Sequence, residues 1–486
     1  MSNSTPRVLG NYVVPRKVRF DNALPHGLPG KSQLVTINSA NGSTYSPTGT
    51  SQIQFYLNSD GFLDSDHTSF VYGLKNTSGV AARLSSSCNS IIRRFRVYGP
   101  SNQVIVDSDY DNYLMALLSD VQVTQDFANT TGNMLMGMAK RSVKVPGQVA
   151  AATPGTPLVF SNCQDSTVVS NYTGNDDIAY FEMNFNHIFN NDKYIGLRSI
   201  NSPGLLVIID LELPNVALRA APTAGISTYN VPVTRSLLNY EIVNPQIHAQ
   251  IVRFGESYTQ FYDSLVAAGG VQLHFDRFTL YRRVLTASSL TTEVLNHRSR
   301  SIKSIVGMVQ RNYYNGIERA ATAAANDNDA NTLASRVDRN APADLTRTYP
   351  TGFQVQLRSG NNVIPQTPLS KPVELYRELL HSLGDSGMSG QAGTRINRDA
   401  YTFVSGGYDF VPASETSDEQ ICKFSWGVDL EAYQDKIQAG YSTMNGENLE
   451  IIMQGTLGSV GGVNYIWVLD DCVVTIDPLG NVSASY

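Results

Sequence analysis

The alternation of apolar and polar residues is clearest in the stretch that ends near Asp120. Residues 92–98 alternate, residues 99–102 are turn formers, and the apolar pattern resumes at residues 104–106. A period of two on both sides of a turn predicts a β-hairpin. A short helix is predicted next, because five apolar or aromatic residues then follow at helical spacing. These residues are Tyr110, Tyr113, Leu114, Leu117 and Leu118.

The same succession of patterns returns later in the chain. Residues 353–364 again predict a hairpin, and residues 375–383 again have helical spacing. Another pair of strand-like segments is also repeated, with 181–185 and 205–209 matched by 424–428 and 449–452. The repeated segments keep the same order and lie about 240 to 260 residues after their first copies, which favours a duplicated domain over a short repeat. Chance similarity between β-hairpins is the alternative explanation.

Length and composition agree with two β-rich domains. A chain of 486 residues fits two domains of roughly 200 to 250 residues. Only 16% of the residues are charged, while glycine, tyrosine and phenylalanine are frequent, which favours strands joined by turns. No apolar run is long enough to cross a bilayer, and the polar N-terminus lacks the apolar centre of a signal peptide. We expect a soluble all-β protein that is not secreted by the usual route.

Proline, glycine and charge divide the chain further. We expect an N-terminal arm over residues 1–50, a first domain over 51–214, a linker over 215–239 and a second domain over 240–486. The second domain carries an exposed insertion near 315–350, which is rich in Ala, Asn and Asp. The arm is basic near its start, since it has five Lys and Arg against one Asp before Gln33. Such an arm either contacts a polyanion or is a solvated tail.

A possible catalytic serine lies in the sequence Gly-Asp-Ser-Gly at residues 384–387. This sequence resembles the nucleophile loop of chymotrypsin-like proteases, whose serine needs a histidine base and an aspartate. Met388 replaces the next expected glycine, and no Ala-Ala-His-Cys-like segment lies upstream. We interpret the segment as a turn after a helix and expect no catalysis by Ser386.

Two further segments resemble ligand loops. Residues 27–32 end like a phosphate-binding loop, but Pro25 stands where the first glycine belongs, and the flanking strand and helix are missing. Residues 107–111 begin like a calcium loop, but Asn112 replaces the bend glycine and Leu118 the bidentate glutamate. We interpret the first as a turn and the second as the cap of the helix that begins near Tyr110.

Cysteine and histidine give no metal or disulfide pattern. The four cysteines lack a Cys-x-x-Cys pair and are expected to be buried thiols in a reducing compartment, and the seven histidines lack ligand spacing. We therefore predict no catalytic, cofactor-binding or metal-binding residues. The cysteines are Cys88, Cys163, Cys422 and Cys472, and the histidines are His26, His67, His187, His248, His274, His297 and His381.

Three arginines on one predicted strand could suggest RNA binding. Arg93, Arg94 and Arg96 are interleaved with Phe95 and followed by Tyr98. Because Phe95 alternates with its arginine neighbours, its side chain should pack inward while the arginines face solvent or a neighbouring subunit. We favour a subunit contact over RNA.

With the duplication in view, the sequence resembles the major capsid proteins of the double-jelly-roll virus lineage. The likeness is to those of polinton-like viruses and virophages and, further off, of algal DNA viruses. It covers most of the chain from residue 52 to residue 476. The residues that carry it are 62–64 with 69–71, the hairpin and helix 91–118, and 438–443.

The resemblance implies two tandem eight-stranded antiparallel jelly-roll sandwiches with short helices in the loops. It also implies homotrimers that form pseudo-hexameric capsomers of an icosahedral shell around double-stranded DNA. The partners would be other copies of the chain, penton and minor capsid proteins, and a weak contact of the interior arm with DNA or other interior components. The protein would act in the virion after synthesis in the host cytoplasm, without cofactor, enzymatic activity or membrane insertion. Residues 121–173 and the insertion would lie at the outer top or at trimer contacts.

Other functions stay open at this point. A receptor-binding or carbohydrate-binding β-sandwich, such as a spike protein, would need a ligand groove. A jelly-roll enzyme would need clustered histidines and carboxylates in one half. A capsid-like product of an integrated mobile element would share the fold.

Overall fold

The structure is a computed structural model, and the following description covers the residues whose placement it defines. These are 28–77, 82–138, 178–189, 193–220, 239–285, 292–311, 347–384, 421–432, 439–444, 448–456 and 462–486, with short pieces at 8–9, 12–13, 168–169, 396, 401 and 446.

Eight strands of the first half of the chain form two antiparallel sheets. One sheet has the order β11-β6-β15-β3, and the other has the order β5-β13-β8-β9. The strands are β3 (Gly30–Asn38), β5 (Gln52–Leu57), β6 (Phe62–Asn76), β8 (Ile92–Tyr98), β9 (Val104–Asp109), β11 (Ala179–Asn184), β13 (Leu205–Leu211) and β15 (Tyr240–Phe254).

Eight strands of the second half repeat this arrangement. Their sheets have the orders β16-β25-β18-β23 and β17-β24-β20-β21. The strands are β16 (Val271–Leu285), β17 (Glu293–Leu295), β18 (Ile302–Arg311), β20 (Thr351–Ser359), β21 (Asn362–Leu369), β23 (Trp426–Asp429), β24 (Leu449–Thr456) and β25 (Gly462–Ile476).

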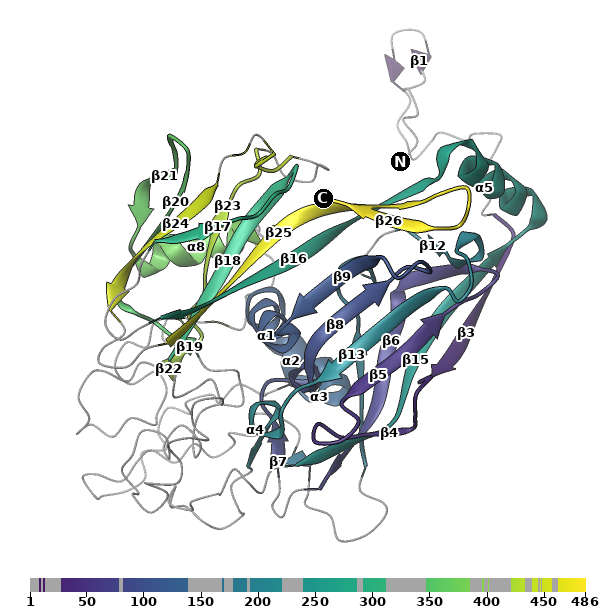
Figure 1. The fold of residues 1–486 in the computed structure, drawn as a ribbon, viewed down its shortest axis with the longest axis horizontal. Helices are drawn as coiled ribbons and strands as arrows, with labels where there is room; N and C mark the ends of the chain where they lie inside the picture. Colours follow the sequence, from purple (N-terminus) through teal and green to yellow (C-terminus); the bar gives the residue numbers. More distant parts are fainter. Residues whose placement is uncertain are drawn as a thin grey trace.

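Both halves therefore have one topology. Numbered along the chain, the strands of each half stand in the order 1-8-3-6 in one sheet and 2-7-4-5 in the other. This is the jelly roll, in which two four-stranded sheets enclose a core. The structure confirms the predicted all-β class and the two eight-stranded sandwiches, which lie side by side (Figure 1).

The repeated hairpin and helix occupy equivalent places. Helix α1 (Asp111–Gln122) follows the β8–β9 hairpin, and α8 (Pro372–Ser382) follows the β20–β21 hairpin. The other helices are α2 (Gln125–Asn129), α3 (Thr131–Met136), α4 (Pro214–Ala217) and α5 (Glu256–Gly269). Among the described residues, no helix is both long and apolar enough to cross a bilayer.

Short strands accompany the two sandwiches. Strand β26 pairs antiparallel with the end of β25. Strands β4 and β12 pair with β15 and β6 of the first jelly roll, and β7 pairs with β10 and β14. Their bounds are β1 (Val8–Leu9), β2 (Tyr12–Val13), β4 (Thr44–Tyr45), β7 (Ala82–Leu84), β10 (Val168–Val169), β12 (Ile195–Gly196), β14 (Leu218–Ala220), β19 (Arg347–Thr348), β22 (Ile421–Cys422) and β26 (Val482–Ser485).

The strand pairing differs from two of the predicted domain boundaries. Residues 30–38, expected in the arm, form β3, and residues 240–254, expected in the second domain, form β15; the two strands pair with each other. Strand β15 also pairs with β6, so both belong to the first jelly roll. Proline and glycine in residues 215–239 mark a break between strands, but they do not tell a connection within a domain from one between domains.

In the sequence, helix α5 instead connects the two jelly rolls, since it follows β15 and precedes β16. Residues 312–346 of the predicted insertion lie outside the described residues. So do residues 139–167 of the long segment after Asp120, whose beginning forms α2 and α3.

Candidate functional site: the joint between the jelly rolls

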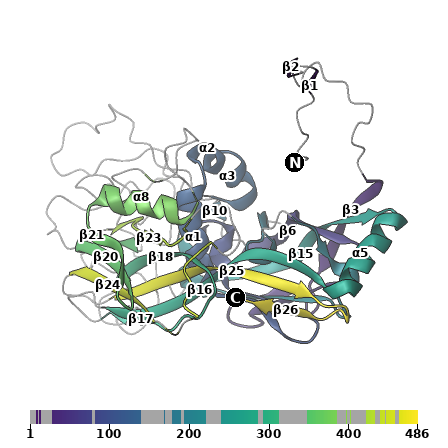
Figure 2. The same cartoon turned by 90° about the horizontal axis from the view of Figure 1, so that it is seen from above.

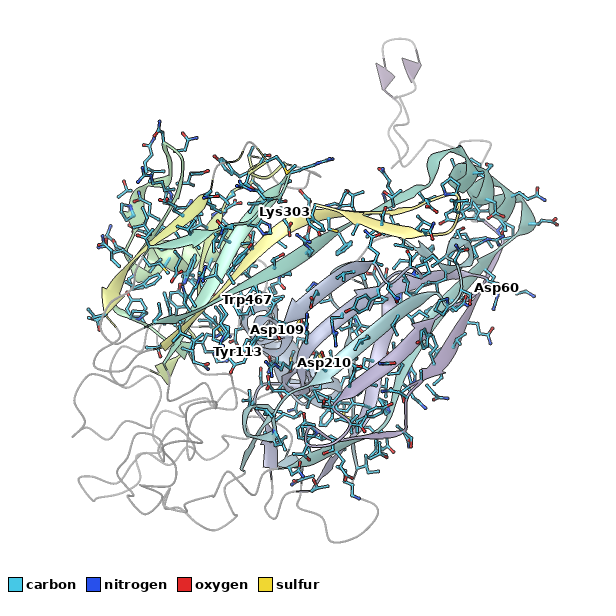
Figure 3. The ribbon with its side chains drawn as sticks, in the orientation of Figure 1. Asp60, Asp109, Tyr113, Asp210, Lys303 and Trp467 are labelled. Atoms are coloured by element: carbon cyan, nitrogen blue, oxygen red, sulfur yellow. The ribbon has the colours of Figure 1, made fainter. Side chains whose placement is uncertain are left out.

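Helix α1 of the first jelly roll lies in the hydrophobic core of the second. Leu114 and Leu117 are fully buried there. The Tyr113 ring stacks on Tyr465 of β25, with 5.0 Å between ring centroids, and Tyr465 stacks in turn on Trp467. Tyr113 and Trp467 mark this position at the centre of the molecule (Figure 3). The helix therefore completes the core of the other jelly roll.

Strands β16 and β25 make the reverse contribution. Each has 15 residues, and at about 3.3 Å per residue each spans about 50 Å, which is longer than one sandwich needs. Figure 1 shows both strands running from the second jelly roll across the first. Their far ends are buried in the first core, through Leu273, Phe275, Cys472, Val474 and Ile476. The two cores therefore share elements.

A buried ion cluster lies where α1 ends. One oxygen of Asp120 is 2.8 Å from the Arg347 guanidinium, and the other is 2.8 Å from the Lys423 ammonium. Arg347 is fully buried, and only 2% of the Asp120 side chain is exposed. The acid comes from the first jelly roll and the bases from segments that flank the second. Removing one member of such a cluster is costly, because it leaves buried charge without its partner.

A buried histidine lies at the other end of α1. His187 Nε2 is 3.2 Å from the Asp111 carboxylate at the start of α1, and Ser108 donates a hydrogen bond to the same carboxylate. The His187 ring stacks on Phe95 and meets the edge of Phe278 in β16. This histidine has a structural place in the joint, as predicted for histidines without ligand spacing.

The suspected phosphate-binding loop is not formed in the structure. Lys31 and Ser32 lie in strand β3, opposite Arg253 and Val252, so no helix follows to cradle a phosphate. The prediction of a turn is wrong for these two residues. Ser386 lies outside the described residues.

The aspartates of the suspected calcium loop are used singly. Asp107 pairs with Arg94 at 2.6 Å, Asp109 accepts a hydrogen bond from the Tyr110 amide, and Asp111 pairs with His187. A calcium site needs six or more oxygens around one point. The segment ends β9 and begins α1 near Tyr110, as predicted, but the N-cap residue Tyr110 makes no side-chain capping hydrogen bond.

The arginine-rich strand carries its own counter-charges. Phe95 is 3% exposed and packs inward, as predicted. Arg94 pairs with Asp107, and Arg96 donates to both oxygens of Asp210 on the neighbouring strand. This neutralised sheet face is poorly suited to a nucleic-acid backbone. Its role as a subunit contact stays a prediction.

Two cysteines are buried thiols, as predicted. Cys88 and Cys472 are free and buried. Burial raises the pKa of both thiols, that of Cys472 to about 12. Neither is a reactive thiolate near neutral pH.

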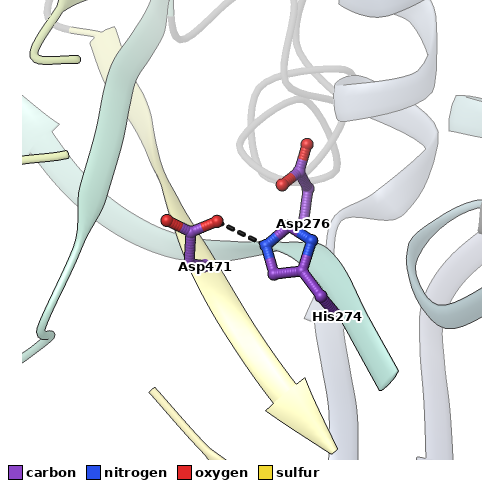
Figure 4. Close-up of side chains that lie close together, drawn as sticks. All are labelled: His274, Asp276 and Asp471. Atoms are coloured by element: carbon purple, nitrogen blue, oxygen red, sulfur yellow. Dashed lines mark hydrogen bonds and ion pairs between the residues drawn. The ribbon is translucent and has the colours of Figure 1, made fainter. Parts of the chain in front are cut away.

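One cluster with the donor types of a metal site did not emerge from the sequence. His274 and Asp276 of β16 and Asp471 of β25 bring ligand atoms within 4.8 Å of one another (Figure 4). The Lys303 ammonium lies 2.6 Å from Asp276 and 3.5 Å from Asp471. It therefore takes the position in which a cation would neutralise these carboxylates.

The electrostatics of this cluster favour the ammonium. Burial alone would lower the pKa of Lys303, but the carboxylates of Asp276, Asp471 and Glu431 raise it above its ordinary value. Burial alone would raise the pKa of Asp471, but hydrogen bonds with His274 and Ser301 and the Lys303 charge lower it. The cluster is a closed ion network. The i, i+2 spacing of His274 and Asp276 on one strand face is visible in the sequence. Asp471 comes close to them only because β25 pairs with β16.

Two fused jelly rolls of one topology form a double jelly roll, and solved structures with a similar fold include a viral major capsid protein. No protein-family model and no curated protein matches the sequence. The likeness lies in the structure: VP54 of the virus PBCV-1 superimposes with a TM-score of 0.56 at 9% identity, covering 96% of this chain and 99% of VP54.

Two other solved structures are similar over more than nine-tenths of both chains. A chain of the Sputnik virophage has a TM-score of 0.55 at 13% identity, covering 100% of this chain and 94% of the other. The Faustovirus major capsid protein has a TM-score of 0.53 at 10% identity, covering 93% and 92%. The likeness spans both jelly rolls in each case and confirms the predicted fold.

Proposed function

We propose that this chain is a major capsid protein. In this proposal three copies form a pseudo-hexameric capsomer, and the capsomers build the icosahedral shell of a double-stranded DNA virus. The observation that carries the proposal is the joint, which holds two jelly rolls of one topology in a fixed arrangement.

A rigid pair of similar domains suits shell building. Three such pairs around a threefold axis present six similar jelly rolls, so a trimer can occupy a nearly hexagonal place in a lattice. Motion between the two jelly rolls would spoil that outline. Buried apolar side chains and the Asp120 cluster oppose such motion, because separation would expose both cores.

The remaining parts of the proposal concern partners and place. The chain would contact other copies of itself, penton proteins and minor capsid proteins, and its basic arm would make a weak contact with DNA or other interior components. It would act in the virion after synthesis in the host cytoplasm. We propose a structural role without catalysis, and the role of a receptor-binding or carbohydrate-binding spike is not favoured.

The proposal is tested by the mass and outline of the purified protein. Light scattering after size exclusion should give about three times the chain mass of 53.1 kDa, because the trimer is the expected building block. Negative-stain images of the same peak should show hexagonal outlines. A monomer that stays monomeric at high concentration would contradict the proposal, and glycan binding by that monomer would support the spike alternative.

A further inference from the structure

Helix α5 has more apolar surface than the chain covers. Its Phe261 and Leu265 side chains are 56% and 44% exposed, and they follow half-buried Tyr258 at helical spacing. We name Tyr258, Phe261 and Leu265 the α5 strip. Such an exposed strip on a helix marks an interaction surface.

The other face of α5 already supplies the contact that holds the helix. Tyr262 and Val266 are buried against Phe62, with 4.8 Å between the Tyr262 and Phe62 ring centroids. An amphipathic helix needs one apolar face to dock on its own domain. Tyr258 also contacts Phe62 and Phe254, so Phe261 and Leu265 are the part of the α5 strip that is open to a second partner.

Charge decides between the candidate partners. Residues 256–269 contain Glu256 and Asp263 and no Lys or Arg, and because Asp263 is paired with Arg198 at 2.9 Å, the negative charge that remains on the helix is that of Glu256. An anionic bilayer prefers helices with basic polar faces, so a membrane surface is disfavoured. A second copy of α5 would bring like charges together. A partner that is both apolar and basic fits best.

The N-terminal arm has that chemistry. Its residues 8–9 and 12–13 form the hairpin β1–β2, whose sequence is Val-Leu and Tyr-Val. Two strands of this length are marginal alone, so the hairpin needs a surface to pack on. Arg7, Arg16, Lys17 and Arg19 give the arm its positive charge.

The arm leaves the body of the protein beside α5. The Gly255 amide, directly before the helix, donates a hydrogen bond to the Pro29 carbonyl. Leu28, the residue before Pro29, is 56% exposed. The 27 residues before Leu28 can span at most about 90 Å when fully extended, which is enough to reach a neighbouring molecule.

We propose that the β1–β2 hairpin of one copy packs on the α5 strip of a second copy. The described residues leave Phe261 and Leu265 exposed, and neighbouring copies in a capsomer would bring a second arm within reach of them. The inference rests on the proposed function, because it requires copies to lie side by side. The arm would then link subunits through apolar contact and charge.

Cysteine cross-linking between two differently marked copies tests the proposal. V13C protein and L265C protein are mixed, assembled and oxidised. A disulfide-linked dimer should form in the mixture and in neither variant alone. The matched control pairs V13C with V373C, which marks a more accessible apolar position on α8, because Val373 is 73% exposed against 44% for Leu265. Unmodified protein, with its own four cysteines, sets the background.

The outcomes separate this inference from the proposed function. Trimers with hexagonal outlines that give no V13C–L265C dimer above the V373C control would overturn the arm contact and leave the capsid proposal standing. A V13C/L265C double variant that forms its disulfide only within one chain, with no linked dimer, would also overturn it. A protein that remains monomeric would overturn both.

Discussion

Helices α1 and α8 hold the same position in the two jelly rolls but serve different cores. Helix α8 stays with its own domain, where Leu379 packs close to Gly427 of β23. Figure 2 shows α8 lying over the second jelly roll. Helix α1 instead leaves its own domain and packs Tyr113 and Leu117 into the second core. The first core receives the ends of β16 and β25 in return.

This difference shows how a duplicated domain can become one unit. Two identical jelly rolls would each bury their own helix and could separate. Here each jelly roll has given apolar side chains to the other, so neither core is complete alone. The following changes should break or sharpen that contrast, from the largest expected effect to the smallest.

Removing the buried acid of the joint should have the largest effect. Asp120→Ala leaves Arg347 and Lys423 buried without their shared carboxylate, which we expect to cost about 3–5 kcal/mol of unfolding free energy. Urea unfolding followed by fluorescence measures this. Asp107→Ala breaks the exposed pair with Arg94 and should cost at most about 1 kcal/mol. Equal losses for the two variants would contradict the proposed role of Asp120.

Truncating the two equivalent helices should separate their roles. Leu117→Ala and Leu379→Ala each create a cavity at a fully buried site and should each cost about 2–5 kcal/mol. Only Leu117→Ala should make the two jelly rolls unfold at different temperatures, because only α1 crosses the joint. Calorimetry of both variants checks this, and a split transition in Leu379→Ala alone would reverse the assignment.

Acid stability should depend on the network that is specific to the second jelly roll. The pKa of Asp471 is lower when folded than its ordinary value near 3.9, through its hydrogen bonds and Lys303, although burial opposes this shift. Its contribution is therefore present above the unfolded pKa and is lost as pH falls through the folded pKa. Asp471→Asn should flatten the fall in stability below about pH 4. An unchanged acid-unfolding curve would contradict the role of this network.

Divalent metal should have the smallest effect. Zn²⁺ or Ca²⁺ should leave the melting temperature of the unmodified protein within about 1 °C, because Lys303 already neutralises the carboxylates of the cluster. Lys303→Met removes that charge, and Zn²⁺ should then raise the melting temperature of the variant. Stabilisation of the unmodified protein by either ion would show that the ammonium yields to metal.

Local patterns in the sequence predict much of the fold. The β8–β9 hairpin with α1 and the β20–β21 hairpin with α8 are visible because alternation and helical spacing are short-range signals. Strand β3 was missed because it is an edge strand with largely exposed side chains and so lacks a clear alternation.

The joint lies beyond what such patterns can show. All eleven residues from Gly462 to Cys472 are buried, so the run predicts a buried strand but does not say which domain covers each end. The partners of Asp120 come from residues 347 and 423, and only the fold brings them to the end of α1.

The most direct test of the shared core is differential scanning calorimetry of the purified unmodified protein. If each core needs the other jelly roll, both halves should unfold in one transition at every protein concentration. Two transitions that persist on dilution, each with the enthalpy of about half the chain, would show that the jelly rolls fold independently and would contradict the account.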